Sequence, residues 1–331
     1  MALFADRNIS RILFVAIDIT AQHHSSWHKR ELHRCNQPAY QHRVNAASVA
    51  KRGASRPPPR SANLMPMSER NRMQIDRSRA TEALKKFTER YDPKNPRIAL
   101  KLSHTLRVAQ NSERIARSER LPKDEVDLAW LLGLLHDIGR FEQVRRFDTF
   151  VDAKSVSHAD LGCEILFGES GTIRSFVSDD SDDGLLRAAV GLHSELALPG
   201  NLAPRTRLHC EILRDADKID ILKVNCLSPI EDIYGVTTQE MRESGLTPEV
   251  VDTFYGHRCV PRSIRREPAD MLVGHICFAY ELARPASLAL MLEQGHLQEM
   301  LSRTFDDPAT EATFRQMEKH MASWLEARDR T

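Results

Sequence analysis

The sequence predicts an all-α fold, and two observations carry this prediction. From about residue 79 onward, apolar residues recur at helical spacing almost without interruption. No run rich in Val, Ile and Thr alternates for long enough to build a sheet. The glycine-rich phosphate loops GxGxxG and GxxxxGK are missing, which disfavours a P-loop or dinucleotide-binding fold. A Gly-x-Ser-x-Gly elbow is also missing.

Ten helices are expected, and several have readable ends. Asn95 is placed to cap the second helix and Pro96 to begin it. Leu121-Pro122 precedes the third, and Gly139 is expected just past its end. A stripe of Met and aromatic residues in the last helix indicates core or interface. The expected helices are residues 79–91, 96–120, 123–138, 158–167, 183–196, 207–224, 239–243, 270–284, 285–303 and 308–328.

The N-terminal segment differs from the rest in composition. Residues 1–80 contain 14 Lys and Arg against 5 Asp and Glu, so the net charge of +1 hides a basic start and an acidic remainder. The stretch 51–60 (KRGASRPPPR) is basic and rich in proline, which is typical of disorder. We expect residues 1–75 to be a dispensable tail. An organellar transit peptide, or translation that starts at Met65, Met67 or Met73, remains open.

Composition bounds the remaining possibilities. Charged residues make up 28% of the chain and hydrophobic residues 41%, which is ordinary for a globular protein. Six cysteines are scattered without a CxxC pair, which argues against a disulfide framework or a zinc ribbon and favours a reducing cytoplasm. The apolar run 12–19 is too short to cross a membrane. A membrane or nucleic-acid partner is therefore not expected.

The doublet His136-Asp137 is the most informative motif. It ends the apolar run 129–135, where an ionised carboxylate would be desolvated and would face the negative end of a helix dipole. A cation shared by the two side chains resolves this conflict, since imidazole and carboxylate together suit divalent metals. A chance His-Asp pair at a helix end is the alternative.

Further histidines and aspartates lie on or beside other helical patterns. Single ligands drawn from several helices are how helical proteins build metal sites. These additional residues are His104, His158, His193, Asp215 and Asp217.

The order His, His-Asp, His, His and a late Ala-Asp-Lys-Ile segment resembles the HD-domain superfamily of metal-dependent phosphohydrolases. The likeness covers about residues 95–225. It implies an HD-domain helical bundle at residues 76–230, with additional C-terminal helices at 231–331 packed on it. It also implies that four residues hold one divalent metal: His104, His136, Asp137 and Asp217. Asp217 fits the family segment better than Asp215, although helical periodicity alone leaves both open.

A second metal is the further implication. The segment from His158 to Gly162 is similar to the His-Pro-x-x-Gly segment of the cyclic-dinucleotide branch, where it and a later histidine matching His193 serve a second ion. The Gly-Tyr-Pro motif and the paired histidines of that branch are absent, and Arg140 replaces its lysine, so cyclic-dinucleotide cleavage is not supported. Each histidine could instead bond a backbone carbonyl or line the pocket. The metal, one ion or two, could be Mn, Co, Mg, Fe, Ni or Zn.

The implied activity is hydrolysis of a small phosphorylated compound, with a nucleotide favoured. The metal would lower the pKa of a bound water, and Asp137 would act at the reacting centre. Arg140 and Lys218 are expected to bind phosphate, whereas Arg145 and Arg146 are expected to form a solvated surface pair. Asp160 and Glu195 are both open as the general acid or base.

Two alternatives remain at this stage. The first is an HD-type di-iron oxygenase, because such enzymes share the same ligand set. The second is a regulatory module that binds a ligand without turnover. The C-terminal helices either cover the pocket or form a homodimer, and the sequence does not choose between these arrangements.

Overall fold

The computed structural model describes residues 73–329, and these contain helices and no strand. The expected tail, residues 1–75, lies outside them except for its last three residues, of which Met73 is buried in the core. No helix among the described residues is long and apolar enough to cross a membrane.

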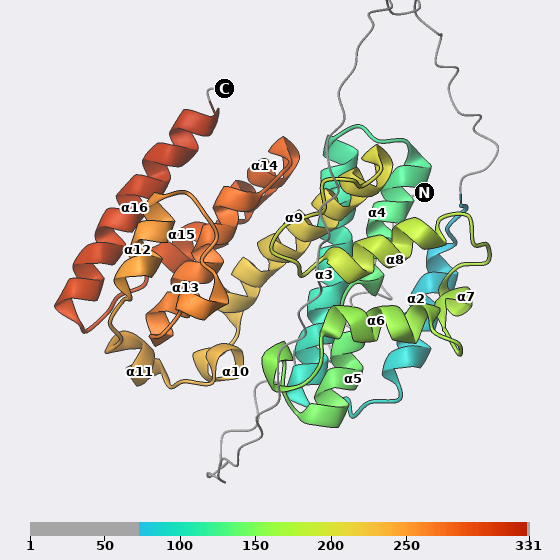
Figure 1. Cartoon of the computed structure of the whole chain (residues 1–331), viewed down its shortest axis with the longest axis horizontal. Coiled ribbons are helices and arrows are strands. Elements are labelled where there is room, and N and C mark those ends of the chain that lie inside the picture. Colours follow the sequence, from blue (N-terminus) through green and yellow to red (C-terminus); the bar gives the residue numbers. More distant parts are fainter. Residues whose placement is uncertain (1–72, 330–331) are drawn as a thin grey trace, which may run out of the picture. The chain divides into compact units, whose positions relative to one another are not determined.

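The predicted ligands lie on or directly beside helices of the group α2 to α9, which Figure 1 labels. Their bounds are α2 Arg77–Thr88, α3 Pro96–Ser118, α4 Lys123–Leu135, α5 Ile138–Phe147, α6 His158–Phe167, α7 Ile173–Phe176, α8 Asp183–Leu192 and α9 Pro204–Leu227, with a 3-10 turn η2 at Asp152–Lys154. Asn95 caps α3 as predicted, because its side chain accepts a hydrogen bond from the backbone N–H of Arg97 (2.9 Å).

The third predicted helix is in fact two helices. α4 ends at Leu135, and α5 begins at Ile138 after a bend at Asp137, whose φ and ψ are −104° and 17°. The expectation that Gly139 terminates the helix is therefore wrong. Gly139 lies inside α5, where an added Cβ would come within 2.1 Å of the carbonyl oxygen of His158. The glycine is needed because α6 crosses α5 too closely for any side chain.

Helix α9 lies between helices α2 to α8 and helices α10 to α16 (Figure 1). It packs on α3, α4 and α8, and also contacts α13, α14 and α15. The C-terminal bounds are α10 Ile230–Tyr234, α11 Thr238–Arg242, α12 Pro248–Tyr255, η3 Arg262–Ile264, α13 Pro268–Ile276, η4 Cys277–Glu281, α14 Pro285–Gln294, α15 His296–Leu301 and α16 Pro308–Asp329. The expected helix 285–303 is broken at Gly295, whose φ of +74° is left-handed.

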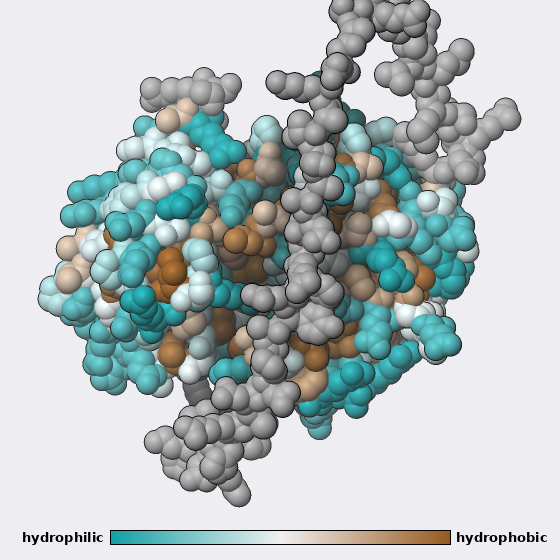
Figure 2. Space-filling view, in the orientation of Figure 1, coloured by the Kyte–Doolittle hydropathy of each residue, from teal (hydrophilic) through white to brown (hydrophobic). Residues whose placement is uncertain are grey.

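The core runs through both groups. The leucines of α4 are buried against α3, where Gly133 lets the two backbones touch: an added Cβ would lie 2.5 Å from the Cα of Ala109. Phe254, Phe314 and Met317 are buried in the C-terminal group. Hydrophilic side chains cover most of the visible outer surface of the described residues, and hydrophobic ones show mainly toward the middle of the view (Figure 2).

Candidate metal centre

Four imidazole rings from four different helical segments converge in the interior. His104 lies in α3, His136 directly follows α4, His158 begins α6 and His193 directly follows α8. The Nε2 atoms of His104 and His136 are 3.3 Å apart, and those of His158 and His193 are 3.0 Å apart. All four side chains are buried. The fold thus brings together histidines that are up to 89 residues apart in the sequence.

Asp137 lies between the two histidine pairs. Its Oδ2 is 3.5 Å from Nε2 of both His104 and His136, and its Oδ1 is 3.6 Å from Nε2 of both His158 and His193. Each carboxylate oxygen therefore faces one pair. Two groups of three donor atoms result, and they share Asp137.

Asp217 joins the first pair from α9. Its Oδ1 is 3.1 Å from Nε2 of His104 and 3.7 Å from Nε2 of His136. Asp215 points elsewhere, because its carboxylate accepts hydrogen bonds from the backbone N–H groups of Ala283 and Arg284 at 3.0–3.1 Å. The structure therefore separates the two aspartates that helical periodicity left open.

Each imidazole is oriented through its second nitrogen. Nδ1 of His104 is 2.7 Å from Asp220, and Nδ1 of His158 is 2.7 Å from Asp152. Nδ1 of His136 and of His193 each lie against a backbone carbonyl, of Gly133 (2.8 Å) and Val190 (2.7 Å) respectively. A neutral ring that donates from Nδ1 has its lone pair on Nε2, and all four Nε2 atoms are turned toward the same interior space.

Three further residues of the centre, Asp152, Asp220 and Lys101, are not predicted from the sequence. Asp220 follows Asp217 by three residues and Lys101 precedes His104 by three, so helical spacing offered a signal for both. Asp152 lies in η2, and no sequence pattern points to it. Arg107 holds Asp220 in place with two hydrogen bonds of 2.7 and 2.9 Å.

The electrostatics of most of the cluster favour a bound cation, and His104 is the exception. Burial lowers the pKa of His104, but its hydrogen bonds to Asp217 and Asp220 outweigh burial and raise it, so a metal would displace a proton from that ring. Burial raises the pKa of Asp137, but the Lys101 ammonium at 2.7 Å and the nearby His136 outweigh it and hold that pKa well below its usual range. Burial lowers the pKa of His136 and of His158 to about 4, so both rings are neutral near pH 7. Neutral imidazoles and ionised carboxylates are the protonation states that bind metals.

The residues predicted to bind phosphate have partners in the fold. Nη1 of Arg140 donates to Gln143, to the carbonyl of Phe150 and to Asp152 at 2.7–2.8 Å. Its Nε lies 3.6 Å from Asp137, beside the centre. Lys218 forms an ion pair with Glu281 at 2.6 Å.

The remaining predicted residues lie further out. Arg145 and Arg146 both pair with Glu142. Asp160 and Glu195 are exposed.

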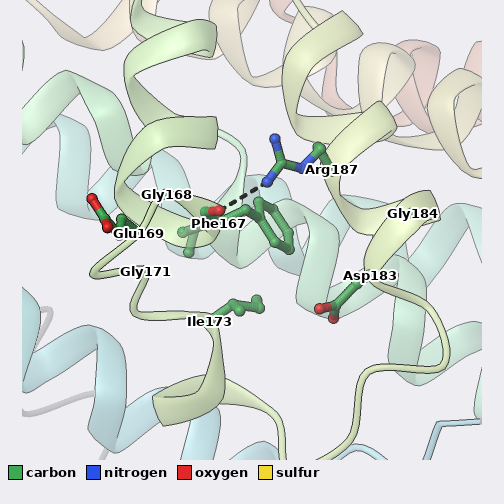
Figure 3. A pocket seen from close by; sticks show the side chains of 9 residues that line it. Phe167, Gly168, Glu169, Gly171, Ile173, Asp183, Gly184 and Arg187 are labelled. Carbon is green, nitrogen blue, oxygen red and sulfur yellow. Dashed lines mark hydrogen bonds between the residues drawn. The ribbon is translucent and has the colours of Figure 1, made fainter.

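A surface pocket of about 310 Å³ lies away from this cluster (Figure 3). It is lined by the end of α6, the start of α7 and the first half of α8, and Arg187 closes one side by donating to the carbonyl of Phe167 at 2.8 Å. None of the predicted site residues lines it. The residues that could hold a metal are therefore in the histidine cluster and not in this pocket.

The donor set fits divalent transition metals. Imidazole nitrogens and carboxylate oxygens suit Mn, Fe, Co, Ni and Zn, whereas Ca and Mg prefer oxygen alone.

Comparison with known proteins gives one match. The family model described as HD domain matches residues 102–222, a span that contains all four histidines of the cluster, Asp137 and Asp217. No curated protein and no solved structure matches the chain. The match and the all-helical fold of the described residues together show that residues 102–222 belong to the HD-domain superfamily.

Proposed function

We propose that the protein is a metal-dependent phosphohydrolase that acts on a small phosphorylated compound, with nucleotides as the first class to test. The observation that carries the proposal is the position of Asp137, whose two oxygens each face a separate histidine pair. His104, His136 and Asp217 would complete one metal position, and His158 and His193 the other. When bound, such ions supply a hydroxide near neutral pH and neutralise charge on a phosphoryl group.

The protein's own side chains would prepare the site. Asp220 and Asp152 hold the rings of His104 and His158 in the tautomer that presents Nε2. Lys101 lies against Asp137 and is placed to contact an anion that enters beside it. Nε of Arg140 lies next to the carboxylate of Asp137, and Asp152 forms an ion pair with Nη1 of the same guanidinium. We assign Arg140 and Lys218 to holding the walls of the site, and Lys101 to phosphate contact.

We also propose the division of the chain into an HD domain at residues 76–230 and a C-terminal helical extension at 231–331. Contacts of α13, α14 and α15 with α9, and of α14 with α3, support packing of the extension on the domain. A reducing cytoplasm is the proposed setting, supported by the free state of the five described cysteines.

Metal analysis after anaerobic purification, combined with phosphate release from a panel of nucleotides, tests the function. His136→Ala and Asp137→Ala should each lose metal and turnover while keeping helix content. The control His320→Ala, on α16, should keep its metal, its turnover and its helix content. Full activity in either ligand variant would overturn the proposal. Two irons with a paramagnetic signal on partial oxidation would favour the di-iron oxygenase, which the four-histidine centre also suits. Neither activity, with tight binding of a small effector, would favour a regulatory module.

A further inference from the structure

Cys226, His296 and Glu299 form a second group of side chains that could hold a metal ion. One donor atom of each residue lies within 4.8 Å of the donor atoms of the other two. Nδ1 of His296 is 3.5 Å from Oε2 of Glu299, and the thiol of Cys226 donates to the carbonyl oxygen of His296 at 3.5 Å. Among the residues that the structure describes, this is the one such group that contains a thiol, and it shares no residue with the histidine cluster.

The group joins α9 to the C-terminal extension. Cys226 lies in the last turn of α9, and His296 and Glu299 are three residues apart on one face of α15, which packs on α9. Gly295, with its left-handed φ of +74°, ends α14 and lets α15 begin at His296. Side chains 70 positions apart in the sequence thus meet where the extension contacts α9.

The group is separate from the histidine cluster. Cys226 follows Asp217 by nine residues, which is about two and a half helical turns, so the two side chains leave α9 on opposite sides. An ion bound by Cys226 would therefore be additional to any ion in the histidine cluster.

The exposure of the three side chains suits an ion that enters from solvent. Cys226 is half-buried, the side chain of His296 is 18% exposed and that of Glu299 is 56% exposed. The sulfur and the imidazole therefore lie on the inner side, and the carboxylate lies on the outer side, where it can rotate onto an ion. A fourth position remains for water, as in zinc sites that have three protein ligands.

The donor atoms favour zinc. A tetrahedral zinc ion has bonds of about 2.0–2.3 Å, which place its donor atoms roughly 3.3–3.6 Å apart, and His296 and Glu299 already have this spacing. A thiolate selects zinc over Mn, Mg and Ca, which prefer oxygen ligands. The histidine cluster contains no sulfur, so the two places differ in the metals they suit.

The thiol carries its proton when no metal is bound. Burial raises the pKa of Cys226 to about 12, with the charge of Glu299 acting in the same direction and that of Arg303 in the opposite one. A metal binds the thiolate, so zinc would displace this proton. Without a metal the thiol is only a weak hydrogen-bond donor, and the fold gains little from a cysteine at this position.

We propose that Cys226, His296 and Glu299 bind a zinc ion that fastens α15 of the C-terminal extension to α9. The ion is distinct from the metal of the proposed hydrolytic centre, and its role is structural. It holds the C-terminal end of α9, the helix that carries Asp217. The total metal content then has two parts, and the ion at Cys226 stays bound in variants that empty the histidine cluster.

Cobalt binding to the full-length chain tests the ligand set. Co(II) bound to a thiolate has a charge-transfer absorption in the near ultraviolet, which Co(II) bound only by nitrogen and oxygen lacks. Metal-free wild type and Asp137→Ala should both develop this band when cobalt is added, and Cys226→Ser should not. Cys163→Ser, which changes a half-buried cysteine of α6, is the matched control and should keep the band. No band in the wild type, or an unchanged band in Cys226→Ser, would overturn the inference.

Thermal unfolding with zinc tests the structural role. Asp137→Ala is the background, because its histidine cluster has lost the carboxylate shared by both histidine pairs. Zinc should raise the unfolding midpoint in this background, since an ion that binds only the folded state stabilises it, and should slow hydrogen exchange in residues 296–301. Adding Cys226→Ser should abolish both effects. Glu299→Gln, a change at an exposed position that should not disturb folding, should reduce them.

Equal midpoint shifts with and without Cys226→Ser would show that the thiol serves only as a hydrogen-bond donor, and the inference would be wrong. None of these measurements is turnover. They therefore test the zinc site whether or not the histidine cluster hydrolyses phosphate.

Discussion

An imidazole binds a cation only through a nitrogen that carries no proton, so the partner of the other nitrogen decides what the ring can do. Here each of the four rings uses Nδ1 for a carboxylate or a carbonyl and leaves Nε2 for the centre. The two carboxylates, Asp152 and Asp220, also raise the basicity of the rings they touch. Asp152 and Asp220 would not touch a metal themselves, but they set the orientation and basicity of the two histidines that would bind it.

Asp220→Asn tests this role. The amide keeps the shape of the side chain but removes the charge that orients and polarises His104. We expect metal affinity to fall about 10- to 100-fold, with activity restored by excess metal, because such partners typically contribute that much. Titration of the metal-free variant measures the affinity. Asp160→Asn, on the exposed side of α6, is the matched control, and equal affinities in both variants would contradict the assigned role of Asp220.

The sequence was informative about the ligands and much less so about their surroundings. His136-Asp137 and the distant histidines could be selected because their residue types, at helical positions, are costly to bury without a purpose. Asp152, by contrast, reaches His158 only because of the path that the chain takes through η2. That path depends on tertiary packing, which no local pattern encodes.

At the scale of elements, the close crossing of α5 and α6 determines where His158 lies. Gly139 has no side chain, and a Cβ there would lie 2.1 Å from the carbonyl oxygen of His158 and 2.7 Å from the amide nitrogen of Gly162. Gly139→Ala should push α6 outward, destabilise the protein by about 2–4 kcal/mol and weaken binding at the His158–His193 pair. Urea unfolding and metal content measure the two effects.

Gly184→Ala is the matched control for this substitution, because an added Cβ at Gly184 meets nothing within 4 Å. If Gly139→Ala were as stable as Gly184→Ala, the close crossing would have no energetic role. The same glycine explains why the predicted helix end was wrong. A glycine after an apolar run ordinarily ends a helix, and only the tertiary contact with α6 reveals that this one permits close packing.

A buried charge network joins α4 to α9 and predicts an acid-sensitive stability. Burial raises the pKa of Glu125, but hydrogen bonds from His209 (2.6 Å) and Arg205 (2.9 Å) outweigh it and lower that pKa from its ordinary 4.5 to about 2. The folded state therefore binds this proton less readily than the unfolded state does. The resulting stability is complete above about pH 4.5 and is lost as the pH falls toward 2.

Glu125→Gln should remove that dependence. We expect the variant to be less stable by about 2 kcal/mol at pH 7, and to lose less further stability than the wild type between pH 5 and pH 2.5. Urea midpoints measured across this range provide the check, with Glu89→Gln, on the exposed end of α2, as the control. Parallel curves for wild type and Glu125→Gln would rule the network out as the cause.

At the scale of the whole molecule, α9 has two roles on two of its sides. Asp217 faces the histidines, and Asp215 faces the C-terminal extension, where it accepts backbone hydrogen bonds that begin the segment leading into α14. The two aspartates are 200° apart around the helix, at about 100° per residue. The residues around Asp217 align with a family segment, so its role could be predicted from the sequence. The role of Asp215 depends on the tertiary structure, which places residues 283 and 284 beside it.

A pair of substitutions separates these roles. Asp217→Asn should lose metal and turnover while hydrogen exchange in residues 277–294 stays slow. Asp215→Asn should do the reverse: metal content stays, exchange in 277–294 quickens, and stability falls by about 1–3 kcal/mol because a buried charge-assisted acceptor is lost. Metal analysis and exchange measured by mass spectrometry on both variants give four readings. Metal loss in Asp215→Asn with retention in Asp217→Asn would reassign the ligand, and with it the orientation of α9 toward the centre.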